Sequence, residues 1–459
     1  MKIMLQLLLA LAAFALAGHA ADEAVQSWID PQSGHRVIQF PRSWIDPDTG
    51  HRVVQLSTEP GSACLYFTQY GFTAGGTKMV MIATQGNIDL VTLATGEIEH
   101  VYQGHGARVL QAGRKTGAIF YTKDGALYAL DPATKQSRLV VKLPEHGNIA
   151  AINCDETLAA GTISATSGTR RSQAPSGQTQ DQAPAARGSR PAYKPGDGIQ
   201  LGDISLGKHP MMDRRLAEHV PTTLFTINLQ TGEIKELLHG TDWIDHEQFS
   251  PTDPSLLMYA HEGRQWEIDR VWLIRADGKS QPMLVHQRTE KMEIAVHEYW
   301  SNDGQWIWYD LQKPLGEDYW VAGYNVTDGG RLWYHLPPDH WSTHYNTTPD
   351  GKLFSGDGSD PIGTDELGMA LNAKWMFLFR PSLVPDMPDE TADQQHMIQV
   401  GRFTAERLVN LSEHDYSIEP NGNFTPDGKW LVFRSNMRGP IQVYAVEIAK
   451  AQATPPTPQ

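Results

Sequence analysis

Three segments of the chain place a histidine in the same position, ahead of a hydroxyl-bearing residue and a turn. They are His246-Glu-Gln-Phe-Ser-Pro, His297-Glu-Tyr-Trp-Ser-Asn-Asp-Gly and His344-Tyr-Asn-Thr-Thr-Pro-Asp-Gly, and a fourth segment, Asn421-Gly-Asn-Phe-Thr-Pro-Asp-Gly, carries asparagine there. In a repeating architecture, equivalent positions of equivalent strands point at one place in space. Three imidazoles around one point would form a metal or catalytic centre, because neutral imidazole is both a metal ligand and a base.

The chain from residue 65 onward is built of repeating units. In each unit, short apolar runs alternate with Asp-Gly, Gly-Gly or Thr-Gly turns, a pattern that predicts four antiparallel strands. Four antiparallel strands per repeat are typical of a propeller blade. We count seven units, at residues 65–104, 105–144, 148–240, 242–288, 293–337, 340–411 and 414–449. The sequence therefore predicts an all-β, seven-bladed β-propeller.

The last unit lacks one strand, while the segment His51-Arg-Val-Val-Gln-Leu-Ser57 has no partner of its own. An N-terminal strand that closes the last blade would remove both exposed edges. The region is duplicated, since Ser27-Trp-Ile-Asp-Pro-Gln-Ser-Gly-His-Arg-Val-Ile-Gln closely matches Ser43-Trp-Ile-Asp-Pro-Asp-Thr-Gly-His-Arg-Val-Val-Gln. Only one copy fits one slot, so we interpret the first copy as redundant and without function.

The remaining segments define the domain organisation. Residues 1–20 combine a charged start, an apolar run and a small-residue cleavage site, which is typical of a secretory signal peptide. Residues 21–42 form an N-terminal extension with the first copy, and residues 43–450 form the propeller. Within it, residues 160–200 have the Ser/Gln/Ala/Pro/Gly composition of a low-complexity insertion. Residues 451–459 are a Pro/Thr-rich tail, expected to be loose. We expect a periplasmic or secreted protein without a membrane span.

Composition limits the partners. A formal net charge of −15 and a pI near 5.6 argue against nucleic acid as a partner. An anionic substrate stays open, because arginines and a metal ion can invert the field inside a cleft. The two cysteines, Cys64 and Cys154, allow either one disulfide or two inert thiols, but no disulfide framework. We expect a monomer or a dimer.

Polar residues recur beside the histidine position. Residues two apart on a strand share a face, so His344 and Asn346 can reach one point, and His246 with Gln248 repeats the pair. Imidazole with an amide oxygen suits manganese, zinc or a similar divalent ion. The alternative is structural, because polar residues of inner propeller strands also bond to channel water or to the next blade. Three histidines in register favour a site, since packing does not explain a repeated polar residue facing a channel.

Longer stretches around these positions resemble the oligogalacturonate lyases. They are His246-Glu-Gln-Phe-Ser-Pro-Thr-Asp-Pro-Ser-Leu-Leu-Met-Tyr-Ala-His261-Glu-Gly, Asp269-Arg270-Val-Trp, His297-Glu-Tyr-Trp and Ser355-Gly-Asp-Gly-Ser-Asp. The resemblance implies a seven-bladed propeller that cleaves pectin fragments by β-elimination, with manganese held by histidines and a glutamine, and with a histidine base. His297 and His344 match ligand positions of the family. Asn346 stands where the family has a further histidine, and Trp341 where it has the glutamine.

The reaction that this resemblance implies assigns roles to the residues. β-Elimination removes a weakly acidic proton beside a carboxylate, so the site needs a cation and a base. His297, His344 and Asn346 are the predicted metal ligands, and Mn²⁺ is the expected ion. His246 is the predicted base, neutral near pH 7, and His261 is the runner-up.

Other residues are candidates for binding the substrate. Arg215 and Arg270 would pair with substrate carboxylates. The alternative for Arg215 is a solvated charge, and for Arg270 a structural salt bridge with Asp269 or Glu267. Three further candidates for substrate contacts are His340, Trp341 and Gln248.

These residues predict a polysaccharide lyase that cleaves short oligogalacturonides into 4,5-unsaturated uronides with the help of a metal. One alternative is a lyase for a non-pectic uronide, such as a glucuronate-containing glycan, because Trp341 and Asn346 depart from the family pattern. A second alternative is a non-catalytic periplasmic propeller that acts as an assembly scaffold. A scaffold has no need to repeat histidines on the channel side.

Overall fold

The computed structural model describes residues 26–29, 36–39, 42–164, 209–315, 317–358, 374–385, 397–415 and 418–451. Almost every regular element in these ranges is a strand. The exceptions are the α-helix α1 (His209–Glu218) and the 3-10 helices η1 (Thr84–Gly86) and η2 (Pro338–His340). No helix in these ranges has the length and apolar character that a membrane span requires. The predicted signal peptide, most of the predicted 160–200 insertion and the predicted tail after residue 451 lie outside the described residues.

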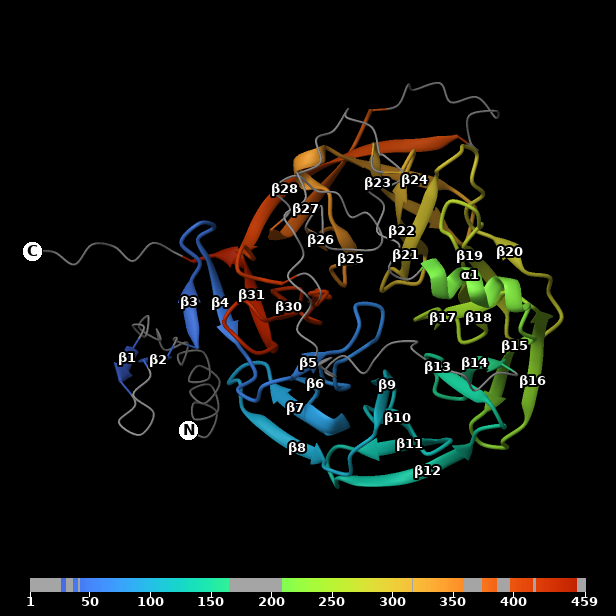
Figure 1. Ribbon diagram of the computed structural model, residues 1–459, viewed down its shortest axis with the longest axis horizontal. Coiled ribbons are helices and arrows are strands. Elements are labelled where there is room, and N and C mark those ends of the chain that lie inside the picture. The colour runs from blue at the N-terminus through green and yellow to red at the C-terminus, as the bar shows by residue number, and fades with distance from the viewer. Residues whose placement is uncertain are drawn as a thin grey trace, which may run out of the picture.

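Four sheets of four antiparallel strands each follow one another along the chain (Figure 1). The first contains β5 (Ala63–Cys64), β6 (Lys78–Ile82), β7 (Ile88–Thr92) and β8 (Ile98–Tyr102). The second contains β9 (Arg108–Ala112), β10 (Ile119–Lys123), β11 (Ala126–Asp131) and β12 (Gln136–Lys142). The third contains β13 (Gly147–Ile152), β14 (Leu158–Ser164), β15 (Thr222–Asn228) and β16 (Ile234–Gly240). The fourth contains β17 (Trp243–Phe249), β18 (Leu256–Glu262), β19 (Val271–Arg275) and β20 (Met283–Leu284).

The next sheet has eight strands and joins two of the predicted repeat units. Its first four strands are β21 (Ile294–Trp300), β22 (Trp306–Gln312), β23 (Tyr319–Asn325) and β24 (Arg331–Leu336). The other four are β25 (Thr343–Thr347), β26 (Phe354–Asp357), β27 (Trp375–Leu383) and β28 (Ile398–Asn410). The two halves meet where β24 pairs in parallel with β28.

The N-terminal segment completes the last sheet. The two copies of the duplicated sequence each form an antiparallel hairpin, β1 (Gln26–Ile29) with β2 (Arg36–Gln39) and β3 (Ser43–Ile45) with β4 (His51–Gln55). The second copy joins β29 (Asn423–Phe424), β30 (Trp430–Ser435) and β31 (Gln442–Lys450), because β4 pairs with β31. The predicted pairing of an N-terminal strand with the last sheet is thus confirmed at β4, whereas β1 and β2 form a two-stranded sheet of their own.

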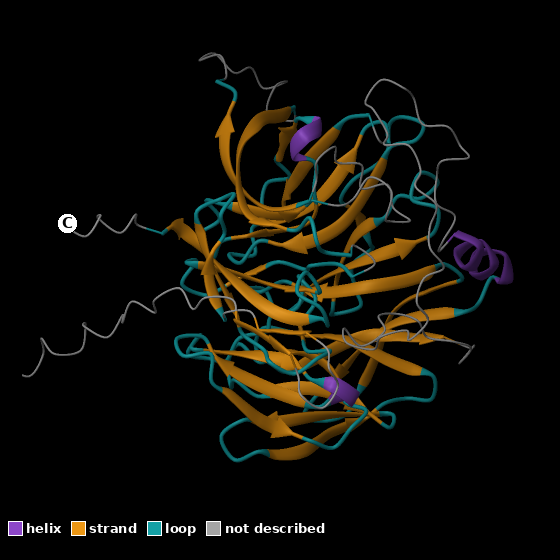
Figure 2. Ribbon diagram, turned by 60° about the vertical axis from the view of Figure 1, so that its left-hand side comes forward, coloured by secondary structure: helices purple, strands orange, loops and turns teal. Residues whose placement is uncertain are grey.

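The apolar core lies between neighbouring sheets. Figure 1 shows the sheets in a ring, with β9, β13, β17 and β21 near the centre and β8, β12 and β16 at the outside, and Figure 2 shows how strands dominate the described chain. One cluster joins Leu90 of β7 to Tyr121 of β10, and another joins Leu273 of β19 to Tyr309 of β22. Each sheet therefore buries its faces against its neighbours and cannot do so alone.

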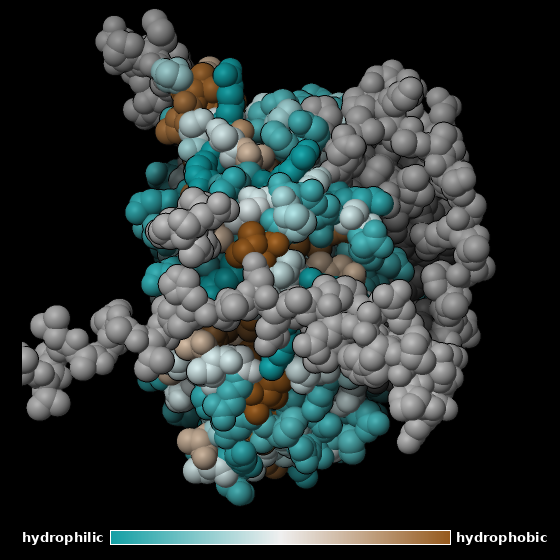
Figure 3. All heavy atoms as spheres, turned by 90° about the vertical axis from the view of Figure 1, so that its left-hand side faces the viewer, coloured by the Kyte–Doolittle hydropathy of each residue, from teal (hydrophilic) through white to brown (hydrophobic). Residues whose placement is uncertain are grey.

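The outside of the ring is mostly polar. Figure 3 shows the face that carries β3 and β4, where hydrophilic side chains predominate among the described residues. Exposed large apolar side chains gather at the ends of β27 and β28, at Leu383, Met397, Ile398 and Val400. The stabilising apolar burial is therefore between the sheets, and closure of the ring should matter for stability.

Replacement of Val53 tests that closure. Val53 is fully buried in β4, opposite Val446 of β31, so we expect Val53→Ala to lower the free energy of unfolding by about 2 kcal/mol. The matched control is Val37→Ala in the first copy of the duplicated segment, which should leave stability unchanged. Denaturant unfolding monitored by circular dichroism measures both. The opposite result, a loss for Val37→Ala alone, would mean that the first copy closes the ring.

Candidate functional site

The repeated histidine position has a distinctive backbone. His246, His297, His344 and Asn421 all have positive φ, at 56°, 54°, 46° and 55°. Such values are uncommon for residues other than glycine. In β17, β21 and β25, the strand pairing shifts at this position, as in a β-bulge. A bulge changes the direction of the side chain that it carries and is common next to active sites. The four residues thus share a positive φ, and the three histidines also share a bulge.

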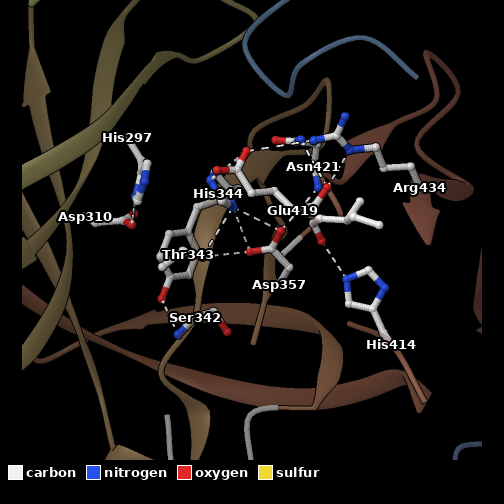
Figure 4. Close-up of polar contacts among 12 residues, drawn as sticks. His297, Asp310, Ser342, Thr343, His344, Asp357, His414, Glu419, Asn421 and Arg434 are labelled. Carbon is white, nitrogen blue, oxygen red and sulfur yellow. Dashed lines mark hydrogen bonds and ion pairs between the residues drawn. The ribbon is translucent and has the colours of Figure 1, made fainter. Parts of the chain in front are cut away.

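Two of these histidines, His297 and His344, bind a carboxylate of the next strand through Nδ1 (Figure 4). Nδ1 of His297 donates to Oδ2 of Asp310 at 2.6 Å. Nδ1 of His344 donates to the Asp357 carboxylate, with 3.1 Å to each oxygen. Asp310 and Asp357 stand in β22 and β26, opposite the residue that precedes each histidine. A carboxylate on Nδ1 fixes the ring and leaves Nε2 as the nitrogen with the lone pair, the arrangement of metal-binding histidines.

The rings of His297 and His344 lie side by side and are almost completely buried. Their centroids are 4.6 Å apart, and the His297 and His344 side chains are 9% and 6% exposed. Phe67 covers both rings, with centroid distances of 6.5 Å and 5.3 Å. Burial lowers the pKa of His344, but the charges of Asp357 and Glu419 outweigh it, so the pKa is raised overall. A divalent ion bound to Nε2 would therefore compete with a proton.

The fourth copy contributes oxygen atoms to the same place. The backbone N–H of Asn421 donates to Oδ2 of Asp357 at 3.2 Å, and its Nδ2 donates to the backbone oxygen of Glu419 at 3.2 Å. Oδ1 of Asn421 is buried and accepts no hydrogen bond from the described residues. Oε2 of Glu419 lies 3.8 Å from Nε2 of His344. The segment from the last sheet thus brings the Glu419 carboxylate to His344 and links Asn421 to Asp357, the carboxylate that orients His344.

His246 is held differently, which corrects its predicted neutral state. Its Nε2, rather than Nδ1, lies 3.2 Å from Oε1 of Glu262. Burial lowers the pKa of His246, but the hydrogen bond to Glu262 overcomes this effect and the pKa rises to about 9. The ring is therefore protonated at neutral pH. Tyr66 lies near both His246 and His344, with centroid distances of 6.2 Å and 6.1 Å, so His246 borders the histidine pair.

Arg270 has a structural role, not the predicted substrate contact. It is 5% exposed, and its Nε donates to Oε2 of Glu298 at 2.9 Å while Nη1 lies 2.9 Å from Oε1 of Glu262. The predicted structural alternative was right in kind but named the wrong partners, Asp269 and Glu267. Since Arg270 also binds the carboxylate that holds His246, it positions that histidine.

Asn346 and Gln248 line a central cavity. Gln248 therefore stays a predicted substrate contact, while the predicted ligand role of Asn346 gains no support from its position. The cavity has a volume of 410 Å³, and His297 and His344 are absent from the described residues that line it. Nδ2 of Asn346 donates to the backbone oxygen of Phe67 at 3.0 Å, and Nε2 of Gln248 donates to the backbone oxygen of Glu298 at 2.9 Å. Both amides hold neighbouring segments together. The bulge at each histidine position breaks the regular alternation on which the prediction depended.

Trp341 and His340 are also misplaced by the prediction. Trp341 is 1% exposed, stacks on Tyr319 at 4.0 Å and donates from Nε1 to the backbone oxygen of Leu336, so it belongs to the core. His340 lines a separate hollow with Arg380 and residues of β28, and burial lowers its pKa. Neither residue touches the central cavity.

The two remaining candidates, His261 and Arg215, have different outcomes. His261 stacks on Trp272 with centroids 5.3 Å apart, and burial lowers its pKa, so it is a neutral ring outside the cavity lining. Arg215 lies on α1 with its guanidinium carbon 4.0 Å from the centre of the Trp243 ring. No described residue forms a hydrogen bond or ion pair with Arg215, although the charges of Asp245 and Glu262 act on it. Its role as a substrate contact stays a prediction.

Sequence reasoning missed the carboxylates. Asp310 and Asp357 each follow their histidine by 13 residues, and this shared offset was the available signal. Within the described residues, three potential metal-ligand atoms of His, Cys, Asp or Glu lie within 4.8 Å of one another only at Glu59, Asp89 and His100. That group has two exposed members and lies on β7, β8 and the chain before β5. The cysteines left open by the sequence, Cys64 and Cys154, are both free thiols.

One family of known proteins matches about half of the chain. Residues 209–452, slightly more than half of the chain, match the family model described as oligogalacturonate lyase. The oligogalacturonide lyase of Pectobacterium atrosepticum is 27% identical over 228 residues, and the oligogalacturonate lyase of Dickeya dadantii is 23% identical over 237 residues. Each alignment covers 49% of this chain and 55% of the relative, so the chain spans about half the length of the curated relatives it matches.

Two solved structures share the fold over nearly the whole chain. An oligogalacturonate lyase in complex with manganese has a TM-score of 0.66 at 21% identity, and covers 93% of this chain and 97% of its own. The oligogalacturonate lyase from Vibrio parahaemolyticus has a TM-score of 0.67 at 20% identity, with 89% and 96% covered. At these identities the likeness establishes the all-β fold.

The raised pKa of His246 predicts a pH dependence of stability. Its folded value of about 9 lies above the ordinary 6.5, so the stabilisation is complete below about pH 6.5 and is lost as pH rises through 9. We expect the difference in unfolding free energy between the wild type and His246→Gln to shrink by roughly 2–3 kcal/mol from pH 6.5 to 10. Denaturant titrations at several pH values measure it. The control, His261→Gln, should show no such change, and a constant difference for His246→Gln would contradict the ion pair.

Proposed function

Because this chain belongs to the oligogalacturonate lyase family, we propose that it cleaves short oligogalacturonides, fragments of pectin, by metal-assisted β-elimination. The products are 4,5-unsaturated uronides. The observation that carries the proposal is the buried pair His297 and His344, each oriented by a carboxylate on Nδ1. That arrangement prepares two Nε2 atoms for one cation, which is the electrophile that the elimination needs.

We also propose that the ring of sheets is a seven-bladed propeller. The four four-stranded sheets and the five-stranded sheet each correspond to one predicted repeat unit. The eight-stranded sheet corresponds to two units, 293–337 and 340–411. Their outer strands, β24 and β28, pair in parallel. Counting that sheet as two blades gives seven.

The residues fit a divalent ion, and manganese is the proposed one. His297 and His344 would hold it. Asn421 binds the carboxylate of Asp357 through its backbone N–H, and we propose its buried Oδ1, which accepts no hydrogen bond from the described residues, as a further oxygen donor. Nitrogen and oxygen donors together suit Mn²⁺. When bound, the ion would neutralise the charge that develops on the substrate carboxylate. The solved relative in complex with manganese supports this identity.

His246 is the proposed base. In the reaction, the base takes the proton on C5, beside the carboxylate; the electrons form the C4–C5 double bond, and the C4–O bond breaks with a proton returning to the leaving oxygen. His246 acts in its neutral form, with Glu262 holding Nε2 and Nδ1 accepting the proton. Since the pKa of His246 is about 9, the base is increasingly available as pH rises toward 9.

Arg215 is the proposed clamp for a substrate carboxylate. Its guanidinium carbon lies over the ring of Trp243, and its charge interacts with that of Asp245. Stacking on an aromatic ring leaves the edge of the guanidinium available for a carboxylate, to which it can donate two parallel hydrogen bonds. An acidic chain with this local cation can therefore still attract an anionic uronide.

A non-pectic uronide is the second candidate substrate. Trp341 is buried in the core and Asn346 holds Phe67, so two positions that carry ligands in the family serve packing here. Such a change in the cluster would favour a different uronide, for example a glucuronate-containing glycan. The composition of residues 1–20 supports a periplasmic or secreted location for either activity.

A lyase assay tests the function directly. Purified protein is chelated, reloaded with or without Mn²⁺, and incubated with digalacturonate or trigalacturonate while the ultraviolet absorbance of the unsaturated product is followed. We expect Mn²⁺-dependent absorbance, and a fall of roughly 100-fold or more in His297→Ala, because the cation loses a ligand.

The predicted role of Arg215 is tested against its neighbour Arg214, which serves as the matched control. Arg215→Gln should raise KM for the oligogalacturonide, whereas Arg214→Gln, an exposed neighbour that pairs with Glu218, should leave kinetics unchanged. An absorbance increase with a glucuronate-containing glycan, together with no increase with either galacturonide, would favour the second candidate substrate. Equal activity of wild type and His297→Ala would refute the assigned centre.

A further inference from the structure

We propose that the carboxylate of Glu419 is a third protein ligand of the divalent ion in this chain. The proposal rests on the proposed metal-assisted function and names a residue that the resemblance does not supply. Glu419 precedes Asn421, the fourth copy of the repeated position, so it approaches the histidine pair from the last sheet. Figure 4 shows its carboxylate between His344 and Arg434.

The distance between Glu419 and His344 suits a shared ion. Oε2 of Glu419 lies 3.8 Å from Nε2 of His344, too far for a hydrogen bond. Bonds from one metal ion to nitrogen and to a carboxylate oxygen are about 2.0–2.2 Å long, so one ion can join atoms up to about 4.2 Å apart. The separation therefore falls within the span of one ion bonded to both atoms.

Two imidazoles alone are a sparse ligand set. The two positions where the family has further ligands hold Trp341, which stacks on Tyr319, and Asn346, which binds Phe67. Neither faces the histidine pair. A carboxylate adds a third donor and negative charge, and carboxylate with imidazole is a donor set that manganese accepts. Among the described residues, Glu419 is the carboxylate that lies against Nε2 rather than Nδ1 of the pair.

Hydrogen bonds hold the backbone oxygen of Glu419, and its side chain is partly exposed. Its backbone oxygen accepts from Nε of Arg434 at 2.6 Å and from Nδ2 of Asn421 at 3.2 Å. Its side chain is 37% exposed, and Nη2 of Arg434 lies 4.0 Å from Oε2. The ligand atoms of His297, His344 and Glu419 are not all within 4.8 Å of one another. The proposal therefore includes a change of the Glu419 side-chain rotamer when the ion binds.

Binding of Mn²⁺ alone tests the proposal without any substrate. The dissociation constant is measured by electron paramagnetic resonance of free Mn²⁺ for the wild-type chain, Glu419→Gln and the control Glu413→Gln, an exposed carboxylate in the same connection. We expect Glu419→Gln to weaken binding at least roughly 10-fold and Glu413→Gln to leave it unchanged. Thermal unfolding checks that each variant is folded.

A second variant separates ligation from simple charge. Glu419→His removes the negative charge but supplies a nitrogen ligand, so a ligand role predicts retained binding with a preference shifted from Mn²⁺ toward Zn²⁺. Wild-type Mn²⁺ affinity in Glu419→Gln would overturn the proposal, as would equal losses in Glu419→His for both metals. If the wild type binds Mn²⁺ and Glu419→Gln binds it weakly, but the wild type has no lyase activity, Glu419 stays assigned as a ligand and the proposed reaction is refuted instead.

Discussion

The hydrogen bond between a buried carboxylate and Nδ1 of a histidine at the repeated position is the constraint on which the rest of the site depends. It exists because the histidine backbone adopts positive φ at a bulge, which turns the ring toward the facing strand. Asp310 and Asp357 then fix two rings with centroids 4.6 Å apart. His246 has the same backbone conformation but binds its carboxylate, Glu262, through Nε2. The same conformation thus carries the proposed base in one copy and the proposed metal ligands in two others.

The ring of sheets is what sustains this arrangement. Positive φ at a residue other than glycine costs about 1–3 kcal/mol at each position and persists only in a framework that over-determines it. The apolar layers between sheets provide that framework, and β4 completes it by joining the N-terminal segment to β31. Arg270 adds a polar link, since it joins Glu262 of one sheet to Glu298 of the next. Local strain at the centre is thus balanced by burial throughout the ring.

Much of this could be predicted from the sequence, and the failures share one cause. Turn spacing located the sheets, and the repeated histidines located the centre, because both are local patterns. The ligand role predicted for Asn346 depended on a two-residue spacing, which shares a face only in a regular strand, and the strand pairing is irregular at His344. Trp341 was misassigned because tight stacking on Tyr319 is a tertiary fact. The pKa of His246 also depends on a contact from another strand, Glu262.

The most direct test of the central constraint is the Mn²⁺ affinity of Asp310→Asn. This change keeps the size of the side chain but removes the charge that orients His297, so we expect the dissociation constant to rise roughly 10–100-fold while the protein stays folded. The exposed Asp339→Asn serves as the control and should bind Mn²⁺ like the wild type. Unchanged affinity in Asp310→Asn, with intact binding by the wild type, would contradict a metal centre built on this hydrogen bond.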